Sequence, residues 1–229
     1  MKVGVITFPG SNCDEDMRHV MRDVIGHVVV ALWHKDHDLQ GVDLVVVPGG
    51  FSYGDYLRSG AIARFSPIMN EVVEHAQRGG LTLGICNGFQ ILCEAGLLPG
   101  TLLHNDSHRF ICKNVFLKGQ SQSAPISGPL VDEVLKIPIA HGEGKYFDHA
   151  DGIKALNDND QVIFRYCDKE GNITPEANPN GSMENIAGVC NAGKNVFGMM
   201  PHPERASEPI VGNTDGLKIL EALSVLESA

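Results

Sequence analysis

The sequence predicts one α/β domain over residues 1–229, with three layers, a mostly parallel central sheet and a partly antiparallel extension. Two observations lead to this fold class. Short apolar, β-branched runs alternate with helical stretches in the first part of the chain, and after about residue 97 the pattern changes to strands with little helix between them. At roughly 150 residues per domain, this length fits one large or two small domains. Because the sequence has no linker, repeat or charge block, we expect a single domain.

The first part of the chain carries four predicted strands that are short, apolar and rich in β-branched residues, as expected of parallel strands buried on both faces. They are Lys2–Phe8, His27–Leu32, Leu44–Val47 and Leu81–Ile85. Helices are expected over Cys13–Ile25 and Pro67–Gln77. The second helix is well delimited, because Ser66 is a natural N-cap residue, proline suits the first helical position, and Gly79-Gly80 ends the helix. This alternation predicts βαβ units with right-handed crossovers.

The second part of the chain is predicted to be rich in strands and loops. Strands are expected over Phe110–Lys118, Pro138–Ala140 and Gln161–Cys167, and a hairpin over Ile186–Cys190 and Asn195–Met200. The segment Asn172–Ser182 is rich in proline, glycine and asparagine, which predicts a loop. An amphipathic helix is expected over Asp215–Ser228, with its apolar residues mostly on one face: Leu217, Ile219, Leu220, Leu223 and Leu226.

Composition and charge argue against several classes of protein. Lys and Arg total 18 against 28 Asp and Glu, and the net charge of −10 argues against nucleic-acid binding, which requires a basic patch. No apolar run approaches the ~18–20 residues of a membrane span. The apolar N-terminal run is too short for a signal peptide and lacks a cleavage site of small residues. We therefore expect a cytoplasmic protein whose six cysteines are thiols.

The strongest functional signal is Gly84-Ile85-Cys86-Asn87-Gly88, which lies between a predicted strand and a helical stretch. The spacing is that of a nucleophile elbow with cysteine in place of serine. In such an elbow the nucleophile occupies a strained strand-to-helix turn, so the neighbouring positions must be small. The helix N-terminus favours a thiolate, and the Asn87 N–H can stabilise an oxyanion. The alternative is a buried structural cysteine with glycines that allow close packing.

A nucleophilic cysteine needs a base, and His202 is the best placed of the ten histidines. It lies in Pro201-His202-Pro203-Glu204, directly after a predicted strand. The flanking prolines fix the direction of the backbone, and the Glu204 carboxylate can orient the imidazole. The sequence therefore predicts a Cys86–His202–Glu204 triad. Without the elbow upstream, a surface turn would explain this motif better.

A glycine-rich turn follows the third predicted strand, in Pro48-Gly49-Gly50. Glycines let backbone N–H groups approach a ligand closely, so the Gly50 N–H is predicted as a second oxyanion donor. An ordinary turn at the end of a strand explains the pattern equally well.

Other clusters carry weaker signals. The pairs His34/His37 and His104/His108 lack the ligand spacing of a known metal site, so no metal is expected. The run His141–Lys145 is glycine-rich but lacks the spacing of a phosphate-binding loop, and we interpret it as a substrate or partner loop. Because the sequence contains no phosphate-binding or dinucleotide motif, we expect no cofactor in this chain and no use of ATP by it.

Three motifs in this order resemble the class I (triad) glutamine amidotransferases, which have a flavodoxin-like fold: Pro48-Gly49-Gly50, Gly84–Gln90 and Pro201–Glu204. The resemblance covers essentially the whole chain. It is closest to the members that serve de novo purine biosynthesis, on the stretches Gly49–Ala61, Ala140–Gly144, Asn178–Ser182 and Gly198–Arg205. Some relatives carry a fused synthetase domain that this sequence lacks, which leads us to expect a separate subunit.

The resemblance implies the roles of the site residues. The Cys86 thiolate attacks the side-chain amide of glutamine, and backbone N–H groups near Gly50 and Asn87 hold the oxyanion. His202 then protonates the departing ammonia and activates water against the thioester. Glu204 orients His202, as the residue pattern also predicts. The contact of Gln90 with the substrate glutamine is implied by the resemblance alone.

The resemblance also implies the partners. Ammonia passes to a large synthetase subunit that uses ATP and Mg²⁺ to convert formylglycinamide ribonucleotide into formylglycinamidine ribonucleotide. A small third subunit bridges the complex. The sequence does not identify the interface, for which Tyr56–Phe65 and Asn172–Ser182 are the candidates.

Two other classes of protein stay open at this point. One is a cysteine peptidase or deglycase of the DJ-1/PfpI type, which shares the elbow but places the base elsewhere and lacks a C-terminal Pro-His-Pro-Glu. The other is a non-catalytic subunit that kept the fold, against which the intact triad argues.

Overall fold

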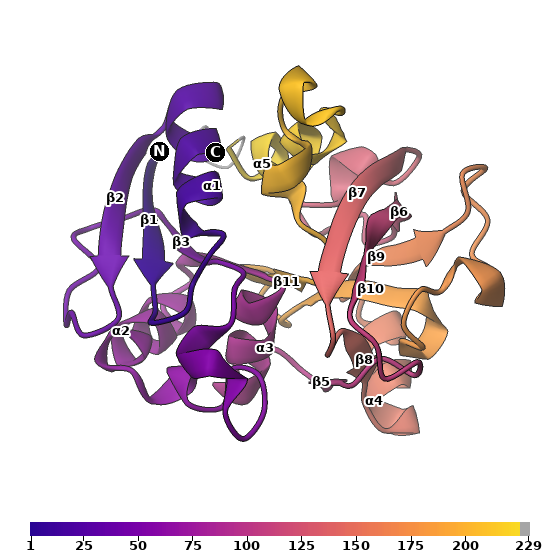
Figure 1. Ribbon diagram of the computed structural model, residues 1–229, viewed down its shortest axis with the longest axis horizontal. Coiled ribbons are helices and arrows are strands. Elements are labelled where there is room, and N and C mark those ends of the chain that lie inside the picture. Colours follow the sequence, from indigo (N-terminus) through magenta and orange to yellow (C-terminus); the bar gives the residue numbers. More distant parts are fainter. Residues whose placement is uncertain (225–229) are drawn as a thin grey trace. The chain divides into compact units, whose positions relative to one another are not determined.

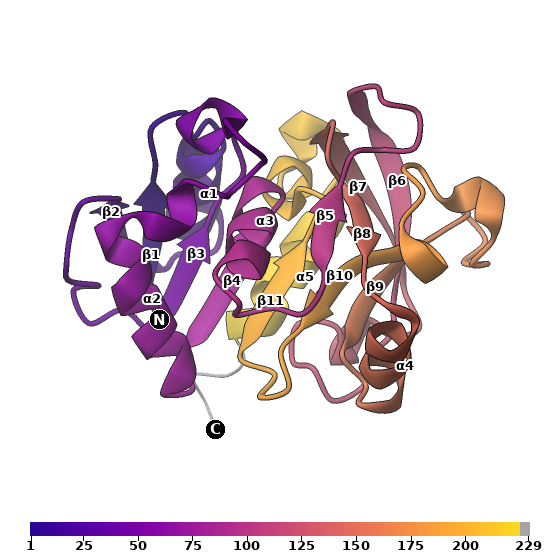
Figure 2. The same ribbon diagram turned by 90° about the horizontal axis from the view of Figure 1, so that it is seen from below.

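The computed structural model describes residues 1–224, and its backbone contacts divide the chain into two compact units. The first unit comprises Met1–Leu98 and Asn195–Gly198, and the second comprises Pro99–Lys194 and the chain from Met199 onward. Figures 1 and 2 show the ribbon from two directions. We describe each unit by itself, and the prediction of a single domain over residues 1–229 stays a prediction.

The first unit is built on parallel strands joined by helical crossovers. Its strands are β1 (Lys2–Thr7), β2 (Val28–Trp33), β3 (Leu44–Val47), β4 (Leu81–Ile85) and β11 (Val196–Met199), in the order β2-β1-β3-β4-β11. The pairings β1–β2, β1–β3 and β3–β4 are all parallel, as predicted. β3 is buried along its whole length. By contrast, five of the six residues of β2 are exposed or half-buried, and the strand lies at the edge of the sheet. This corrects the expectation that all four strands are buried on both faces.

The helices of the first unit follow the predicted pattern. They are α1 (Asp14–His19), continued by a π-helical turn over Val20–Val24, then α2 (Pro67–Gln77) and α3 (Asn87–Glu94), with 3₁₀ turns at Ser52–Asp55 and Ala63–Phe65. The chain moves outward in opposite directions in the β1–β2 and β3–β4 crossovers. Right-handed crossovers therefore put α1 and α2 on opposite faces of the sheet, as Figure 2 shows.

One local detail of α2 differs from the prediction. The Ser66 side chain makes no capping hydrogen bond within the described chain, although the residue stands at the N-cap position. Its hydroxyl is instead 2.9 Å from the Tyr53 hydroxyl. A tertiary hydrogen bond thus takes the place of the local one.

The second unit is built on antiparallel strands. β6 (Ile111–Gly119) pairs with β7 (Val134–His141) and with β9 (Val162–Cys167), and β9 pairs with β10 (Ile186–Cys190). A separate two-stranded sheet joins β5 (Thr101–Leu103) and β8 (Lys145–Phe147). The antiparallel extension is therefore confirmed, while β7 is longer than the predicted Pro138–Ala140.

The helices of the second unit are short. They are α4 (Ala150–Asp158) and α5 (Asp215–Ser224), with 3₁₀ turns at Gly128–Leu130, Pro175–Ala177, Met183–Asn185, Pro203–Ala206 and Pro209–Val211. The sequence pattern does not predict α4, which buries only two side chains, Ile153 and Leu156. In α5 the predicted apolar face is confirmed for Ile219, Leu220 and Leu223, while Leu226 lies outside the described residues. No helix within residues 1–224 has the length and apolar character needed to cross a membrane.

Candidate active site

Cys86 occupies a strained turn between β4 and α3. Its φ and ψ angles are 50° and −105°, a combination that a residue with a Cβ rarely adopts. The side chain is almost buried, with 5% of the residue exposed. This strand-to-helix geometry is that of a nucleophile elbow.

The two glycines of the motif are required by the packing of this turn. A Cβ on Gly84 would lie 2.6 Å from Leu92 Cδ1 and 2.8 Å from the backbone carbonyl of Gly88. A Cβ on Gly88 would lie 1.8 Å from the backbone oxygen of Val47, at the end of β3. Small residues are therefore required on both sides of Cys86, as predicted, because β4, α3 and the end of β3 meet without room for side chains.

We expect Gly88→Ala to destabilise the protein by more than about 3 kcal/mol, because the new methyl group would have to displace backbone rather than a flexible side chain. Urea or thermal unfolding measures this loss. Gly142→Ala is the control, since its Cβ would meet nothing nearer than 3.9 Å, and we expect a change below about 1 kcal/mol. An unfolding midpoint of Gly88→Ala equal to that of the wild type would contradict the close packing of the elbow.

The side chain of Asn87 ties the elbow to the loop after β3. Its Nδ2 donates to Gln90 Oε1 at 2.9 Å and to Asp55 Oδ1 at 3.2 Å, while its Oδ1 accepts the Ser52 N–H at 3.1 Å. Asn87 and Gln90 are buried, at 2% and 6% exposed. The predicted substrate contact Gln90 and the predicted oxyanion donor Asn87 are therefore directly hydrogen bonded to each other.

Gly50 has a structural reason for being glycine. Its φ is 145°, and a Cβ there would lie 2.8 Å from the Asn12 nitrogen and 2.8 Å from Ser11 Cα. An isolated bridge pairs Gly50 with Ser11. The close approach of two loops thus explains this glycine without a ligand, and its role as an oxyanion donor stays a prediction.

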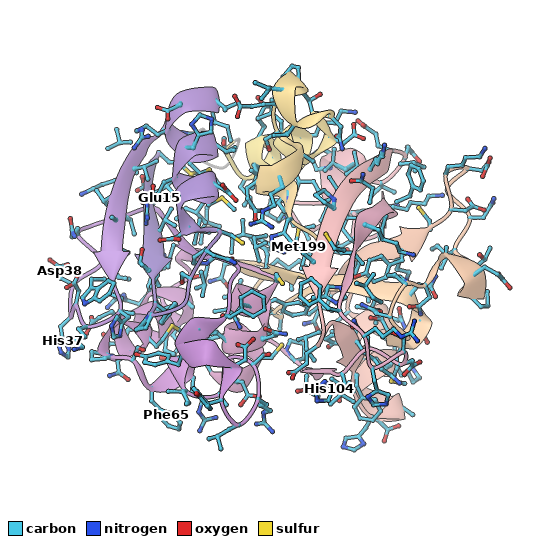
Figure 3. All side chains as sticks on the ribbon, viewed as in Figure 1. Glu15, His37, Asp38, Phe65, His104 and Met199 are labelled. Carbon is cyan, nitrogen blue, oxygen red and sulfur yellow. The ribbon has the colours of Figure 1, made fainter. Side chains whose placement is uncertain are left out.

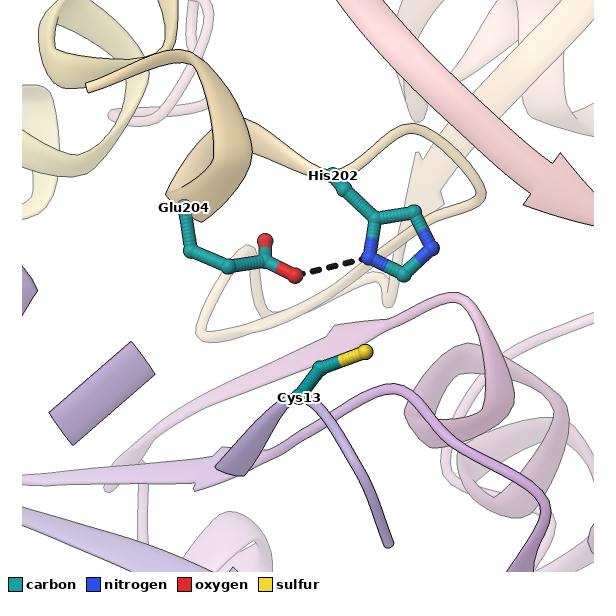
Figure 4. Close-up of side chains that lie close together, drawn as sticks. All are labelled: Cys13, His202 and Glu204. Atoms are coloured by element: carbon teal, nitrogen blue, oxygen red, sulfur yellow. Dashed lines mark hydrogen bonds and ion pairs between the residues drawn. The ribbon is translucent and has the colours of Figure 1, made fainter. Parts of the chain in front are cut away.

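In the second unit, His202 and Glu204 form a buried pair. The His202 Nδ1 lies 2.7 Å from Glu204 Oε1, and the two residues are 2% and 4% exposed (Figure 4). The carboxylate accepts the Nδ1 proton, which leaves the lone pair of the neutral imidazole on Nε2, the arrangement of a general base. Cys13, which is also drawn in Figure 4, is a residue of the first unit.

Two neighbouring elements hold the backbone of this pair. The His202 N–H donates to the Pro138 carbonyl of β7 at 2.9 Å. A Cβ on Gly216, in the first turn of α5, would lie 2.0 Å from the Pro203 carbonyl oxygen, so the segment packs directly against the helix. The motif is therefore a buried segment in contact with β7 and α5, and not the surface turn that was the alternative.

His141 is a second buried histidine near His202, and no pattern in the sequence predicts its place there. Its Nδ1 lies 3.1 Å from Asn105 Oδ1, which also accepts the Gly144 N–H at 3.0 Å. Asn105 Nδ2 donates to the His141 carbonyl, which fixes the orientation of the amide. Burial above all, and then the nearby charge of His202, lower the pKa of His141 to about 4, so the ring is neutral at pH 7.

The predicted site residues thus form two groups. The first unit brings together Cys86, Asn87 and Gln90, with the loop that follows Gly50. The second unit brings together His202 and Glu204. Among the histidines that were considered for metal binding, His34 has another partner: its Nδ1 lies 2.7 Å from the Tyr53 hydroxyl.

A cysteine elbow in a parallel α/β unit and a buried histidine–carboxylate pair are the parts of a triad amidotransferase. The chain belongs to the family of CobB/CobQ-like glutamine amidotransferase domains, whose model matches residues 1–218. The family predicted from the three motifs is therefore confirmed.

The proteins that are similar to this chain have more specific names than the family. A curated phosphoribosylformylglycinamidine synthase subunit PurQ from Koribacter versatilis is 55% identical over 224 residues, which are 97% of each chain. The PurQ subunit from Salinibacter ruber is 53% identical over 223 residues, 97% of this chain and 95% of that one. A chain in the solved structure of PurLQS from Thermotoga maritima matches with a TM-score of 0.86 and 42% identity over 98% of both chains, which confirms the predicted amidotransferase fold class.

Proposed function

We propose that this chain is the glutaminase subunit of a phosphoribosylformylglycinamidine synthase. The observation that carries the proposal is the strained elbow at Cys86, in a chain 55% identical to a curated PurQ subunit over 97% of its length. In this proposal the chain hydrolyses glutamine to glutamate and delivers ammonia to a synthetase that amidates formylglycinamide ribonucleotide.

The first half of the proposed reaction releases ammonia. His202 accepts the proton of the Cys86 thiol, and the resulting thiolate attacks the side-chain amide carbon of glutamine, so that a C–S bond forms and the carbonyl electrons move onto oxygen. The N–H groups of Gly50 and Asn87 stabilise that oxyanion, and Gln90 contacts the substrate. His202 donates a proton to the amide nitrogen, the C–N bond breaks, and ammonia leaves behind a glutamyl thioester.

The second half regenerates the thiolate. His202 accepts a proton from water, whose oxygen attacks the thioester carbon. The C–S bond breaks and glutamate leaves. Throughout both halves the Glu204 carboxylate accepts the Nδ1 proton of His202, which orients the ring and stabilises its positive charge when it is protonated.

The proposed partners follow from the relative of known structure. The solved structure from Thermotoga maritima is of PurLQS, so that relative of this chain works with PurL and PurS in a complex. For this chain we propose the corresponding assembly: a large synthetase subunit, which binds ATP and Mg²⁺, and a small bridging subunit. The proposal places the assembly in the cytoplasm and gives this chain no cofactor of its own.

Glutamate release by this chain tests the proposal when it is measured with and without the synthetase, the small subunit, ATP and formylglycinamide ribonucleotide. We expect slow hydrolysis by the isolated chain and an increase of about tenfold or more in the complex, because ammonia released without an acceptor is wasted. Rapid hydrolysis by the isolated chain that the partners leave unchanged would reject the proposal.

A further inference from the structure

The segment 51–65 combines large exposed apolar side chains with a position beside the elbow. It follows the Gly50 turn directly. Within it Leu57 is 92% exposed, Tyr56 74% and Phe65 72%. Figure 3 shows Phe65 at the outer margin of its unit. Such a concentration of apolar surface in one loop marks an interaction site rather than ordinary surface.

The segment is held firmly against α3, the helix that begins at the elbow. Arg58 donates to both carboxylate oxygens of Glu94, at 2.6 and 2.7 Å, and Arg64 Nη1 donates to the Glu94 carbonyl at 2.7 Å. Gly60 lies so close to the helix that a Cβ there would be 2.8 Å from the Ile91 nitrogen. The apolar residues are therefore presented on a fixed backbone.

The backbone conformation of this segment is unfavourable, and packing within the chain does not offset it at Leu57. Tyr53, Asp55 and Leu57 all adopt the left-handed region, with φ of 54°, 54° and 73°. For a bulky residue such as leucine this conformation is unfavourable, because Cβ lies too close to the following carbonyl oxygen. Because Leu57 buries almost nothing within the chain, packing does not offset that cost. A partner that covers Leu57 would offset that cost by burying its side chain.

The chemistry of the surface fits a protein partner. The guanidinium of Arg64 stacks over the Phe65 ring at 4.4 Å, and Tyr, Phe and Arg are the side chains enriched at interface cores. An open hollow of about 460 Å³ adjoins Phe65. Its basic lining residues are Lys35, His34 and His37, and no Asp or Glu is among the lining residues. An apolar or acidic side chain of the partner would fit it.

We propose that segment 51–65 is the docking surface for the ammonia-consuming synthetase, and that docking acts on the elbow through the contact between Asp55 and Asn87. The inference rests on the proposed function. Most free ammonia in water at pH 7 is protonated to ammonium, which is not a nucleophile, so transfer at low ammonia concentration requires the consuming subunit to bind beside the site of release. The start of segment 51–65 meets that requirement, because Ser52 and Asp55 are hydrogen bonded to Asn87, the residue after Cys86.

The route of the coupling is short. Asp55, two residues before Leu57, accepts a hydrogen bond from Asn87 Nδ2 at 3.2 Å, and the Ser52 N–H donates to Asn87 Oδ1 at 3.1 Å. Asn87 follows the nucleophile and is the predicted oxyanion donor. A partner that fixes Leu57 therefore fixes the side chain that positions Asn87.

Leu57→Asp tests the docking surface in the full-length chain with purified synthetase and small subunit. Aspartate tolerates the left-handed region, so the variant should fold, which its thermal midpoint verifies. We expect the Kd to rise about tenfold or more, because a charge would enter an apolar contact. Ile210→Asp is the matched control, at a residue that is 90% exposed in the second unit, and we expect less than about a twofold change. Equal Kd values for the two variants would overturn the docking surface.

Asp55→Ala tests the coupling, with the ratio of glutamate release in the complex to that of the isolated chain as the readout. We expect binding within about threefold of wild type but a stimulation ratio reduced about tenfold, and rescue by Asp55→Asn, which keeps an acceptor for Asn87. A ratio unchanged in Asp55→Ala would overturn the coupling. If the wild-type chain shows no glutamine-dependent amidation with the synthetase, the proposed function itself fails, whatever the variants do.

Discussion

Cys86→Ala is expected to abolish glutamine-dependent amidation by the reconstituted complex while amidation driven by added ammonium continues. The substitution removes the atom that forms the thioester, so the loss in kcat should be about 10³-fold or more. The synthetase would still accept ammonia from solution, so that rate should stay within about twofold of wild type. Both rates are measured on the same assembled complex by following formation of the amidated ribonucleotide.

Cys93→Ala is the matched control for that experiment. It removes a half-buried thiol from α3, the same helix, and we expect both activities to stay within about threefold of wild type. Loss of both activities from a Cys86→Ala complex that still assembles would contradict the assigned role. So would survival of the glutamine-dependent reaction.

The parallel part of the fold could be predicted closely because its signals are local. The bounds of β3, β4 and α2 agree with the predicted ranges to the residue, since each is an apolar run or a helix flanked by proline and glycine. The elbow was predictable for a similar reason. Its two glycines are required by the meeting of β4, α3 and the end of β3, so the constraint appears in the sequence as a fixed spacing.

The features that escaped prediction depend on tertiary contacts. The exposure of β2 follows from its place at the edge of the sheet, which its apolar sequence does not reveal. The short helix α4 has too few apolar positions to show a period. The hydrogen bond between Asp55 and Asn87 joins residues 32 positions apart, and the neutral state of His141 depends on its burial. No local pattern encodes any of these.

The candidate site could be predicted from the sequence only in part. The residue types and motif order predict Cys86, His202 and Glu204 as the triad, because each stands in a segment whose backbone is restricted by glycine or proline. Only the His202–Glu204 contact is visible as geometry, at 2.7 Å. For Gly50 the structure offers a packing reason that competes with the predicted oxyanion role, so sequence alone could not separate the two.

Glu204→Gln is expected to lower kcat for glutamine hydrolysis by about 10²- to 10⁴-fold with little change in KM. Glutamine has nearly the shape of glutamate, so the buried segment should stay folded. Its amide, however, can present an N–H to His202 Nδ1, which would move the ring proton to Nε2 and leave no lone pair for the base. It also removes the negative charge that stabilises the imidazolium in a site where both residues are buried.

The measurement is glutamate release by the assembled complex over a range of glutamine concentrations, with ammonium-dependent amidation as an internal standard that should not change. Glu221→Gln, at an exposed carboxylate of the same unit, is the control and should alter kcat by less than about twofold. If Glu204→Gln raised KM and left kcat intact, the carboxylate would be a binding group and not the residue that orients the base. The 2.7 Å contact with Nδ1 and the burial of both residues favour the effect on kcat.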